Sequence, residues 1–376
     1  MRSIGLALIT MTLIVGCSKD GKSPAFNEIV IGEYASMTGS TATFGQSTHK
    51  GIQLALDEVN AVGLLGKKVK IITEDDQGKP EQAVNAVLKL IQRDHVVAVL
   101  GEVASSCSIA AAPVCQQNRI PMLSPSSTNP DVTKKGDFIF RACFIDPFQG
   151  LVMAKFATTT LKVKTAAIFA DQRQDYSVGL AQFFKETFTR LGGQVVAEES
   201  YQTNDKEFRP QLINIRRAKP DVIFVPGYYT ECALIAKQAR ELGITQPFLG
   251  GDGWDSEVTL QSGGAAVNGS YFSTHYSPDD PQPEVQHFVT KYRQRYGTTP
   301  DAMAVTGYDA AHLLFDAMKR AGSTSPETVC KALAATRDFP GVSGKITIDE
   351  NRNARKDAVV LKIENGKFNF AERIAP

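Results

Sequence analysis

Small polar residues gather directly after two short apolar runs, residues 96–100 and 120–123. Such runs predict buried strands, and open α/β sheets bind ligands at the carboxyl ends of their strands. The polar residues are Ser105 and Ser106 after the first run, and Ser126, Ser127 and Thr128 after the second. A helical pattern follows Ser106, so the first pair lies near a helix N-terminus, which attracts anions. The pattern predicts a carboxylate-binding site of hydroxyls and backbone amides; the alternative is ordinary helix caps and turn residues.

The second half of the chain has different chemistry at its strand ends. Three predicted strands end before tyrosines, an aspartate and the only tryptophan: residues 165–170 before Tyr176, 222–225 before Tyr228 and Tyr229, and 247–249 before Asp252 and Trp254. If the two halves face each other, one wall offers hydrogen-bond donors and the other a carboxylate and aromatic rings. This arrangement suits a zwitterion such as an amino acid. Alternatively, Asp252 is an Asp-Gly turn residue, and the aromatic residues belong to the surface or the core.

The number of such contacts sets the affinity to expect. Hydrogen bonds to charged groups contribute about 1.5–3 kcal/mol each. Three or four of them would support roughly micromolar binding after the costs of ordering and closure. A ligand that bonds to both walls also favours the closed arrangement of the two halves.

Strands and helices alternate regularly through residues 28–249, which predicts mainly parallel sheets with helices on both faces. In the first half we expect strands over 28–34, 68–75, 96–100, 120–123 and 138–141, and helices over 45–62, from Pro80 onward and over 108–117. In the second half we expect helices over 147–161, 178–191, 207–218 and 231–242, and strands over 165–170, 194–201, 221–225 and 247–249. Two such α/β units in tandem predict two lobes facing across a cleft.

The remainder of the chain is predicted to return to the first half. A strand over 268–273 and a turn-rich crossing over 278–283 lead to amphipathic helices over 284–296, 302–321 and 327–335. Strands over 344–348 and 358–363 follow near the end. A chain that crosses between lobes more than once forms a stiff hinge, which suits closure around a bound molecule.

The N-terminus has the features of an export signal followed by a lipid attachment site. Arg2 precedes an apolar stretch, residues 4–15, that is too short to span a bilayer. Residues 14–17, Ile-Val-Gly-Cys, resemble the lipobox of bacterial lipoproteins, in which cleavage leaves Cys17 as a lipidated first residue. Residues 1–16 are therefore predicted to be a signal peptide, and residues 17–26 the lipidated cysteine and its tether. The alternative is a secreted protein with an incidental cysteine.

Charge, length and cysteine usage narrow the class of protein. The 376 residues carry 41 lysines and arginines against 40 aspartates and glutamates, so nucleic acid is not an expected partner. The length suggests two domains, and no segment after the signal is apolar for long enough to cross a membrane. Five further cysteines without paired spacing fit buried thiols better than a disulfide framework, although a bridge from Cys107 to Cys143 stays open.

Motifs for catalysis are absent from the sequence. The five histidines are widely spaced and form no HExxH or other metal-binding pattern. Neither GxSxG nor a GxxxxGK[ST] phosphate loop occurs, and no GxGxxG follows the first strand. We therefore expect no enzyme activity, no cofactor and no metal, with Ser105 and an unseen base as a formal alternative.

Several segments together resemble one family. They are IGEYASMTGSTATFGQ from Ile31, LGEVASSCS from Leu100, SPSSTNPDVT from Ser124, RACFIDPFQG from Arg141, DQRQDYSVG from Asp171, PGYYTECALIAKQARELG from Pro226 and GGDGWDS from Gly250. The chain is similar to the periplasmic binding proteins of branched-chain amino acid ABC transporters, the leucine/isoleucine/valine-binding type, from Ile29 to its end. The resemblance implies the two-lobed type I fold, with a mainly parallel sheet in each lobe and a multi-strand hinge.

The resemblance also implies domain limits and partners. The N-terminal lobe would comprise residues 27–145 and 276–354, and the C-terminal lobe residues 146–275 and 355–376. The protein would be extracytoplasmic, held to a membrane only by its lipid anchor, monomeric, and a partner of ABC permease subunits. The alternative function is a sensory protein that binds an amino acid, amide or small carboxylic acid and docks on a receptor.

Individual roles carry over by position. By this resemblance, the ligand carboxylate is held by Ser105, Ser126 and Thr128. The ammonium is held by Asp252, with help from Tyr176 and Tyr228. The pocket for the ligand side chain is formed by Phe44, Glu102 and Trp254. Asp252 is one methylene shorter than the glutamate of the leucine-binding members, which leaves the ligand open. Glu102 makes a polar amino acid a further possibility. The disulfide of the leucine-binding members has no counterpart, because Ala104 and Lys79 occupy that region.

Overall fold

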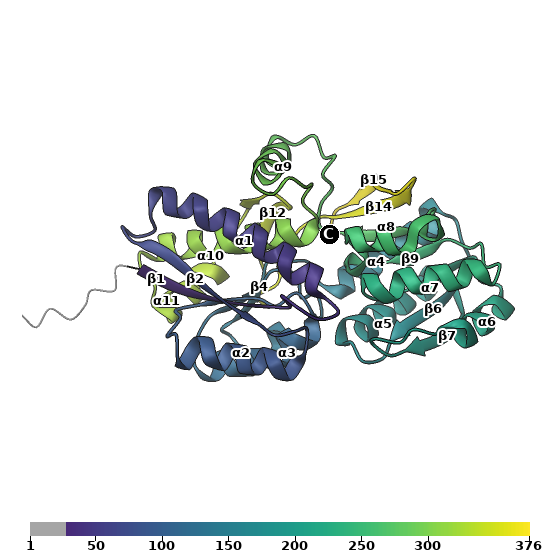
Figure 1. Cartoon of the computed structure of the whole chain (residues 1–376), viewed down its shortest axis with the longest axis horizontal. Coiled ribbons are helices and arrows are strands. Elements are labelled where there is room, and N and C mark those ends of the chain that lie inside the picture. Colours follow the sequence, from purple (N-terminus) through teal and green to yellow (C-terminus); the bar gives the residue numbers. More distant parts are fainter. Residues whose placement is uncertain (1–27) are drawn as a thin grey trace, which may run out of the picture.

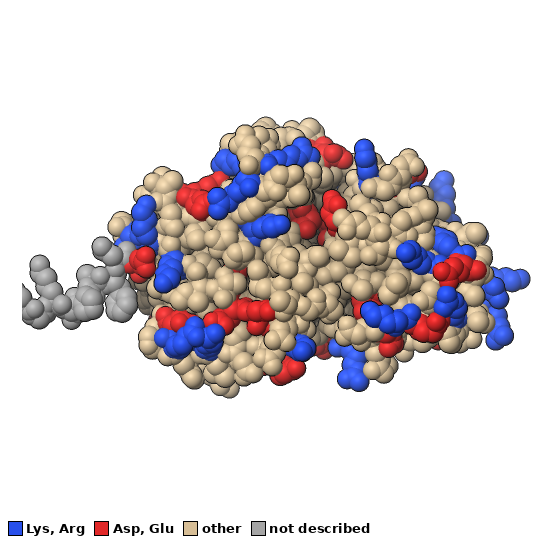
Figure 2. Space-filling model, viewed as in Figure 1, with Lys and Arg blue, Asp and Glu red and all other residues tan. Residues whose placement is uncertain are grey.

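The computed structural model describes residues 28–376, so the predicted signal peptide, Cys17 and the tether lie outside it. Two α/β lobes lie side by side, each built around one large sheet (Figure 1). Within the described range, no helix is long and apolar enough to cross a membrane. Acidic and basic side chains are mixed over the face seen in Figure 2, in keeping with the balanced composition.

The first lobe contains a parallel five-stranded sheet of order β2-β1-β3-β4-β5. Its strands are β1 (Glu28–Ala35), β2 (Lys68–Asp75), β3 (Val99–Leu100), β4 (Met122–Ser124) and β5 (Ile139–Arg141). One face is covered by α2 (Pro80–Gln92) and α3 (Ser105–Gln117), and the other by α1 (Ala42–Val62), α10 (Ala302–Ala321) and α11 (Pro326–Ala334). Successive strand residues face opposite sides, so Val99 packs toward α2 and α3 whereas Leu100 packs toward α1 and α10.

The second lobe contains a seven-stranded sheet of order β15-β14-β10-β9-β8-β6-β7. The parallel strands are β6 (Thr165–Asp171), β7 (Gln194–Tyr201), β8 (Val222–Phe224), β9 (Phe248–Gly250) and β10 (Tyr271–Thr274). The strands β14 (Ala358–Glu364) and β15 (Lys367–Ile374) are added antiparallel. The helices are α4 (Asp146–Lys155) and α5 (Asp175–Arg190) on one face, and α6 (Arg209–Ala218) and α7 (Tyr229–Glu241) on the other, with α8 (Glu257–Gly263) against α7.

The chain passes between the lobes three times: after β5, after β10 and before β14. The returning segment forms α9 (Pro283–Tyr296), α10 and α11, then a small antiparallel sheet of β11 (Phe339–Gly341), β12 (Gly344–Ile348) and β13 (Ala354–Arg355). Several crossings make the multi-strand hinge that the sequence predicts. The domain limits at residues 145, 275 and 354 stay a proposal; sheet membership supports the first two, whereas the limit at 354 divides β13, both residues of which belong to the small sheet.

Most predicted elements are present, and the differences have local causes. The predicted strand 96–100 is reduced to β3, because only residues 99 and 100 pair with both neighbouring strands. The predicted helix 147–161 ends at Lys155 and continues as a π-helical turn, Phe156–Thr160. The sequence does not predict α8, which has only seven residues, or β15, an edge strand whose Phe370 is half exposed. The five described cysteines are buried and free, so Cys107 and Cys143 are not bridged.

Candidate functional site

A small cavity lies between the two lobes, where their strand ends meet. We call it the interlobe cavity; its volume is only about 10 Å³, because the walls contributed by the two lobes lie close together. It is lined by Phe44, Val103, Ser126, Thr128, Tyr176, Tyr228, Asp252, Gly253 and Met303. Six of the nine predicted ligand-binding residues therefore line one cavity, and they come from both lobes.

The first-lobe wall is formed by the loop after β4. Ser126 Oγ lies 2.5 Å from Thr306 Oγ1 of α10. The hydroxyl of Thr128 is buried and has no hydrogen-bond partner of good geometry among the described residues. Ser124 Oγ donates to the Glu102 carbonyl at 2.7 Å, which ties this loop to the one after β3. The loop is therefore fixed, while the Thr128 hydroxyl has no well-formed hydrogen bond within the described residues and lies near the Asp146 carboxyl.

The second-lobe wall places Asp252 between two donors. Gln149 Nε2 of α4 donates to Asp252 Oδ1 at 2.9 Å, and His275 Nε2, just after β10, lies 3.1 Å from Oδ2. Burial lowers the pKa of His275, although its bond to Asp252 acts in the other direction. A neutral imidazole with its proton on Nε2 donates to the carboxylate and leaves the negative charge uncompensated. The wall therefore presents a buried, oriented anion to the cavity.

Aromatic rings close the cavity around Asp252. The rings of Tyr176 and Tyr228 stack with their centroids 5.3 Å apart, and Phe44 meets Tyr228 edge-on at 5.7 Å. The Gly253 N–H donates to Tyr176 Oη at 3.2 Å, which holds that ring against the Asp252 turn. A Cβ at Gly251 would lie 2.4 Å from Tyr176 Oη, so the turn needs glycine for this close approach.

The sequence profile described as periplasmic binding protein matches residues 28–367, nearly the whole described chain. The chain belongs to the periplasmic binding protein family. Members of this family bind solutes. Membership in the family therefore confirms the expectation that this protein is not an enzyme, which the absence of catalytic motifs alone would not do.

Relatives and solved structures agree with this assignment. The protein is 32% identical over 371 residues to the Leu/Ile/Val-binding protein BraC3 of Rhizobium johnstonii, covering 98% of this chain and 100% of the relative. It resembles the crystal structure of the leucine binding protein LivK from Thermotoga maritima with a TM-score of 0.90 and 43% identity, covering 93% and 99% of the two chains. It resembles LivJ of Streptococcus pneumoniae in complex with isoleucine with a TM-score of 0.88 and 33% identity, covering 93% and 100%.

This binding protein is in a closed arrangement, because direct hydrogen bonds join its lobes. Asn129 Nδ2 donates to the Asp175 carbonyl at 2.7 Å, and the Asp175 N–H donates to Ser106 Oγ at 2.9 Å. The Thr43 N–H donates to Tyr229 Oη at 3.3 Å. These contacts surround the interlobe cavity and would have to break for a ligand to enter or leave.

Three predicted residues do not line the interlobe cavity, so their roles toward a ligand stay predictions. Glu102 points toward the β1 loop, where its carboxylate accepts from the Ser36 N–H at 3.0 Å and the Ser36 hydroxyl at 2.7 Å. Trp254 is buried in the second-lobe core and donates to the Val225 carbonyl at 2.9 Å. Ser105 Oγ accepts from the Asn129 N–H at 3.2 Å. The argument from Glu102 to a polar ligand therefore loses its basis.

The sequence pattern misses five residues of the site. Val103 and Met303 form its apolar end with Phe44, and Gly253 lies beside Tyr176. Gln149 and His275 orient Asp252 from behind. Val103 lies in the same strand-end loop as Ser105 and could have been found there. Gly253 directly follows Asp252 and could have been found in the same way, whereas Met303, Gln149 and His275 come from α10, α4 and the end of β10, and only the fold brings them together.

A second buried acid lies behind the cavity. Asp146 begins α4, and its backbone N–H donates to the Thr128 carbonyl at 2.9 Å. Burial raises the pKa of Asp146 well above its usual range, and the charge of Asp252 adds to this, while the nearby Thr128 hydroxyl opposes it. No hydrogen bond of good geometry satisfies either carboxyl oxygen within the described residues. The raised pKa of Asp146 disfavours a second negative charge beside Asp252.

Proposed function

We propose that this protein captures a branched-chain amino acid or a close analogue in the interlobe cavity and delivers it to an ABC permease. The observation that carries the proposal is the position of Thr128 and Asp252 on opposite walls of one cavity. A free hydroxyl on one side and an oriented carboxylate on the other match the two charged groups of an amino acid.

Each part of the ligand has a counterpart in the cavity. Ser126, Thr128 and nearby backbone amides would hold the carboxylate, with Ser105 close behind them. Asp252 would hold the ammonium, with the electron-rich faces of Tyr176 and Tyr228 beside it. The side chain would lie against Phe44, Val103 and Met303, none of which carries a charge. This apolar end favours an aliphatic side chain over a polar one.

The relatives support the same ligand class. BraC3 is described as a Leu/Ile/Val-binding protein, LivK as a leucine binding protein, and the LivJ structure contains isoleucine. Binding across two lobes would stabilise the closed arrangement, since a ligand shifts an equilibrium only by binding one state better than the other. A permease would then recognise the closed form.

The N-terminus supports an extracytoplasmic site of action. The sequence Ile-Val-Gly-Cys at residues 14–17 would be cleaved before Cys17, and the lipid on Cys17 would hold the protein at a membrane. A substitution of Cys17 by serine should abolish incorporation of labelled fatty acid, which the parent protein should incorporate. Equal labelling of the parent and the C17S variant, or no labelling of the parent, would contradict the lipid anchor.

The function is tested with the protein from Ser18 onward, by calorimetry with leucine, isoleucine, valine, leucinamide and 4-methylpentanoate. We expect roughly micromolar binding or tighter for at least one of the three amino acids, and at least about a hundred-fold weaker binding for the amide and the deaminated acid. Equal binding of the deaminated acid would contradict the role of Asp252. A deletion strain should lose uptake of the same amino acid, and unchanged uptake would favour a sensory role.

A further inference from the structure

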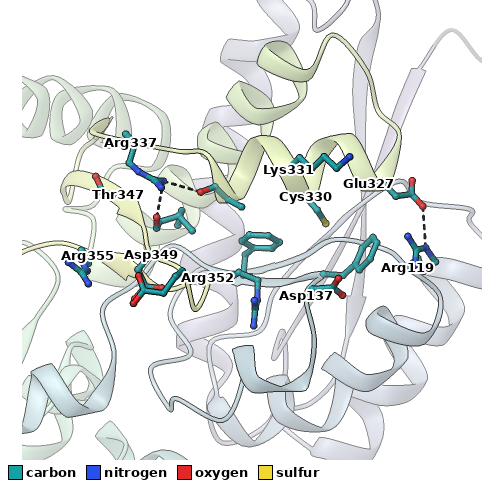
Figure 3. Close-up of a pocket in the computed structure, with 15 residues that line it drawn as sticks. Arg119, Asp137, Glu327, Cys330, Lys331, Arg337, Thr347, Asp349, Arg352 and Arg355 are labelled. Carbon is teal, nitrogen blue, oxygen red and sulfur yellow. Dashed lines mark hydrogen bonds and ion pairs between the residues drawn. The ribbon is translucent and has the colours of Figure 1, made fainter.

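The most open cavity of the first lobe is separate from the interlobe cavity. We call it the flank cavity; it has a volume of about 540 Å³ and lies between β5, α11 and the segment from Thr347 to Arg355 (Figure 3). The two cavities share no lining residue. We propose that the flank cavity is a second ligand site, for an amphipathic monoanion such as an apolar carboxylate or sulfonate. The proposal goes beyond the transport function and does not depend on it.

The floor of the flank cavity is apolar. Phe138 just before β5, Phe140 of β5, Ile348 of β12 and Cys330 of α11 line it and are at most 8% exposed. The strand β5 is the last of its sheet. Figure 3 shows Cys330 pointing from its helix toward the facing strand. A volume of this size with an apolar floor is typical of small-molecule sites.

The rim of the flank cavity carries charges of both signs, but its acids already have donors. Glu327 pairs with Arg119 at 3.2 Å, and Asp137 accepts from Gln116 Nε2 at 2.7 Å. Asp349 accepts from the N–H groups of Asn351 and Asn353 at 2.8 and 2.9 Å. Among the lining acids, only Glu350 has no hydrogen bond or ion pair within the described part of the chain.

The cations of the rim are less satisfied than the acids. Lys331 and Arg355 have no hydrogen bond or ion pair to any described residue, and Arg337 donates only to backbone carbonyls. The Nε of Arg352 is buried and unpartnered, although its Nη2 donates to the Thr133 carbonyl at 3.0 Å. Solvent does not reach this Nε, so the side-chain donors open to a ligand in the flank cavity are those of Lys331, Arg337 and Arg355. The groups left to bind a ligand are therefore mainly cationic donors.

Occupation of the flank cavity does not require lobe closure. Its lining residues lie between 119 and 140 and between 327 and 355, in β5, α11, β12 and β13 and in the turns that connect elements of the first lobe. A ligand there touches only one lobe, so it gains nothing from the closed arrangement. The two sites should therefore be occupied independently.

The test uses 8-anilinonaphthalene-1-sulfonate as the probe, because it combines an apolar body with one negative charge. Fluorescence titration of the protein from Ser18 onward should show saturable binding that leucine does not displace. The double variant Lys331→Ala, Arg355→Ala should weaken probe binding by about ten-fold or more while leaving leucine binding unchanged. The matched control is Arg217→Ala, Lys237→Ala, which removes one exposed lysine and one exposed arginine from the second lobe and should bind the probe normally.

A second measurement locates the probe. Cys330 is 8% exposed and the other described cysteines at most 1%, so Cys330 should react first with a thiol reagent. Saturating probe should slow that reaction, and leucine should not. The proposal is overturned if the probe does not bind, if leucine displaces it, if the Lys331 and Arg355 variant binds it as the control does, or if Cys330 reacts at the same rate with the probe present.

Discussion

Asp252 and Glu102 are both buried acids that follow the end of a parallel strand, yet their surroundings give them opposite uses. Asp252 is held from behind by the side chains of Gln149 and His275, so it stays free on the cavity side. Glu102 is surrounded by donors of its own lobe, including the Ser36 N–H and hydroxyl and the Ala104 N–H. The first acid is placed for a ligand, and the second connects the loops after β1 and β3.

The largest effect that separates the two acids is expected for Asp252→Asn. The variant should weaken leucine binding by at least about a hundred-fold, because the ammonium loses its charged partner in a buried site. Stability should fall only modestly: asparagine keeps the shape and one acceptor oxygen, although its amide nitrogen then faces Gln149 or His275, both of which donate to Asp252. Calorimetry and urea denaturation measure the two quantities. If the variant bound leucine within three-fold of the parent, or if its free energy of unfolding fell by about 3 kcal/mol, Asp252 would have a structural role like that of Glu102.

The reverse pattern is expected for Glu102→Gln. An amide nitrogen would then face N–H or hydroxyl donors, so the free energy of unfolding should fall by about 2–3 kcal/mol. The dissociation constant for leucine should stay within about three-fold of the parent, since Glu102 does not line the interlobe cavity. A large loss of affinity with unchanged stability would show that Glu102 contacts the ligand after all.

The pH dependence of the free energy of unfolding tests the surroundings of Glu102, because the charge of Glu102 affects the pKa of its neighbour Asp76. Burial, followed by the charge of Glu102, raises the pKa of Asp76 from 3.8 to about 9. The folded state therefore binds more protons than the unfolded state between these values, so this group's stabilising effect is complete below about pH 4 and declines toward pH 9. Asp76→Asn mimics the protonated acid and should raise the free energy of unfolding at pH 8 by about 1–3 kcal/mol, with no gain at pH 4. The same pH dependence of the free energy of unfolding in the parent and in Asp76→Asn would contradict this account.

The smallest effect is expected at the contacts that hold the lobes together. Asn129→Asp keeps the side-chain oxygen that accepts from the Asp131 N–H at 2.9 Å but removes the donor to Asp175. Losing one interlobe bond should weaken leucine binding by about three- to ten-fold, mainly through faster dissociation. Stopped-flow measurements give both rates. A slower association with unchanged dissociation would mean that Asn129 acts on the open form instead.

The sequence predicts the fold well because the strands and helices have clear periodicity. Residues 68–75, 194–201, 302–321 and 344–348 have the predicted limits, and the sheets are mainly parallel as predicted. The site is harder to predict from the sequence. The end of a predicted strand indicates which loop faces the cleft, but it does not indicate the direction in which each side chain of that loop points. Ser126, Thr128 and Asp252 reach the interlobe cavity, whereas Glu102 and Trp254, equally close to strand ends, turn into their own lobes. Met303 and His275 have no local signal at all.

The central claim is that Asp252 recognises the ammonium of a ligand whose carboxylate lies at Thr128. A calorimetric cycle tests it most directly, with leucine and 4-methylpentanoate as ligands and the parent and Asp252→Asn as proteins. The account predicts that removing the ammonium costs the parent at least about 3 kcal/mol and the variant less than about 1 kcal/mol, a strong coupling. Equal losses in both proteins would show that the ammonium binds elsewhere, and would contradict the account.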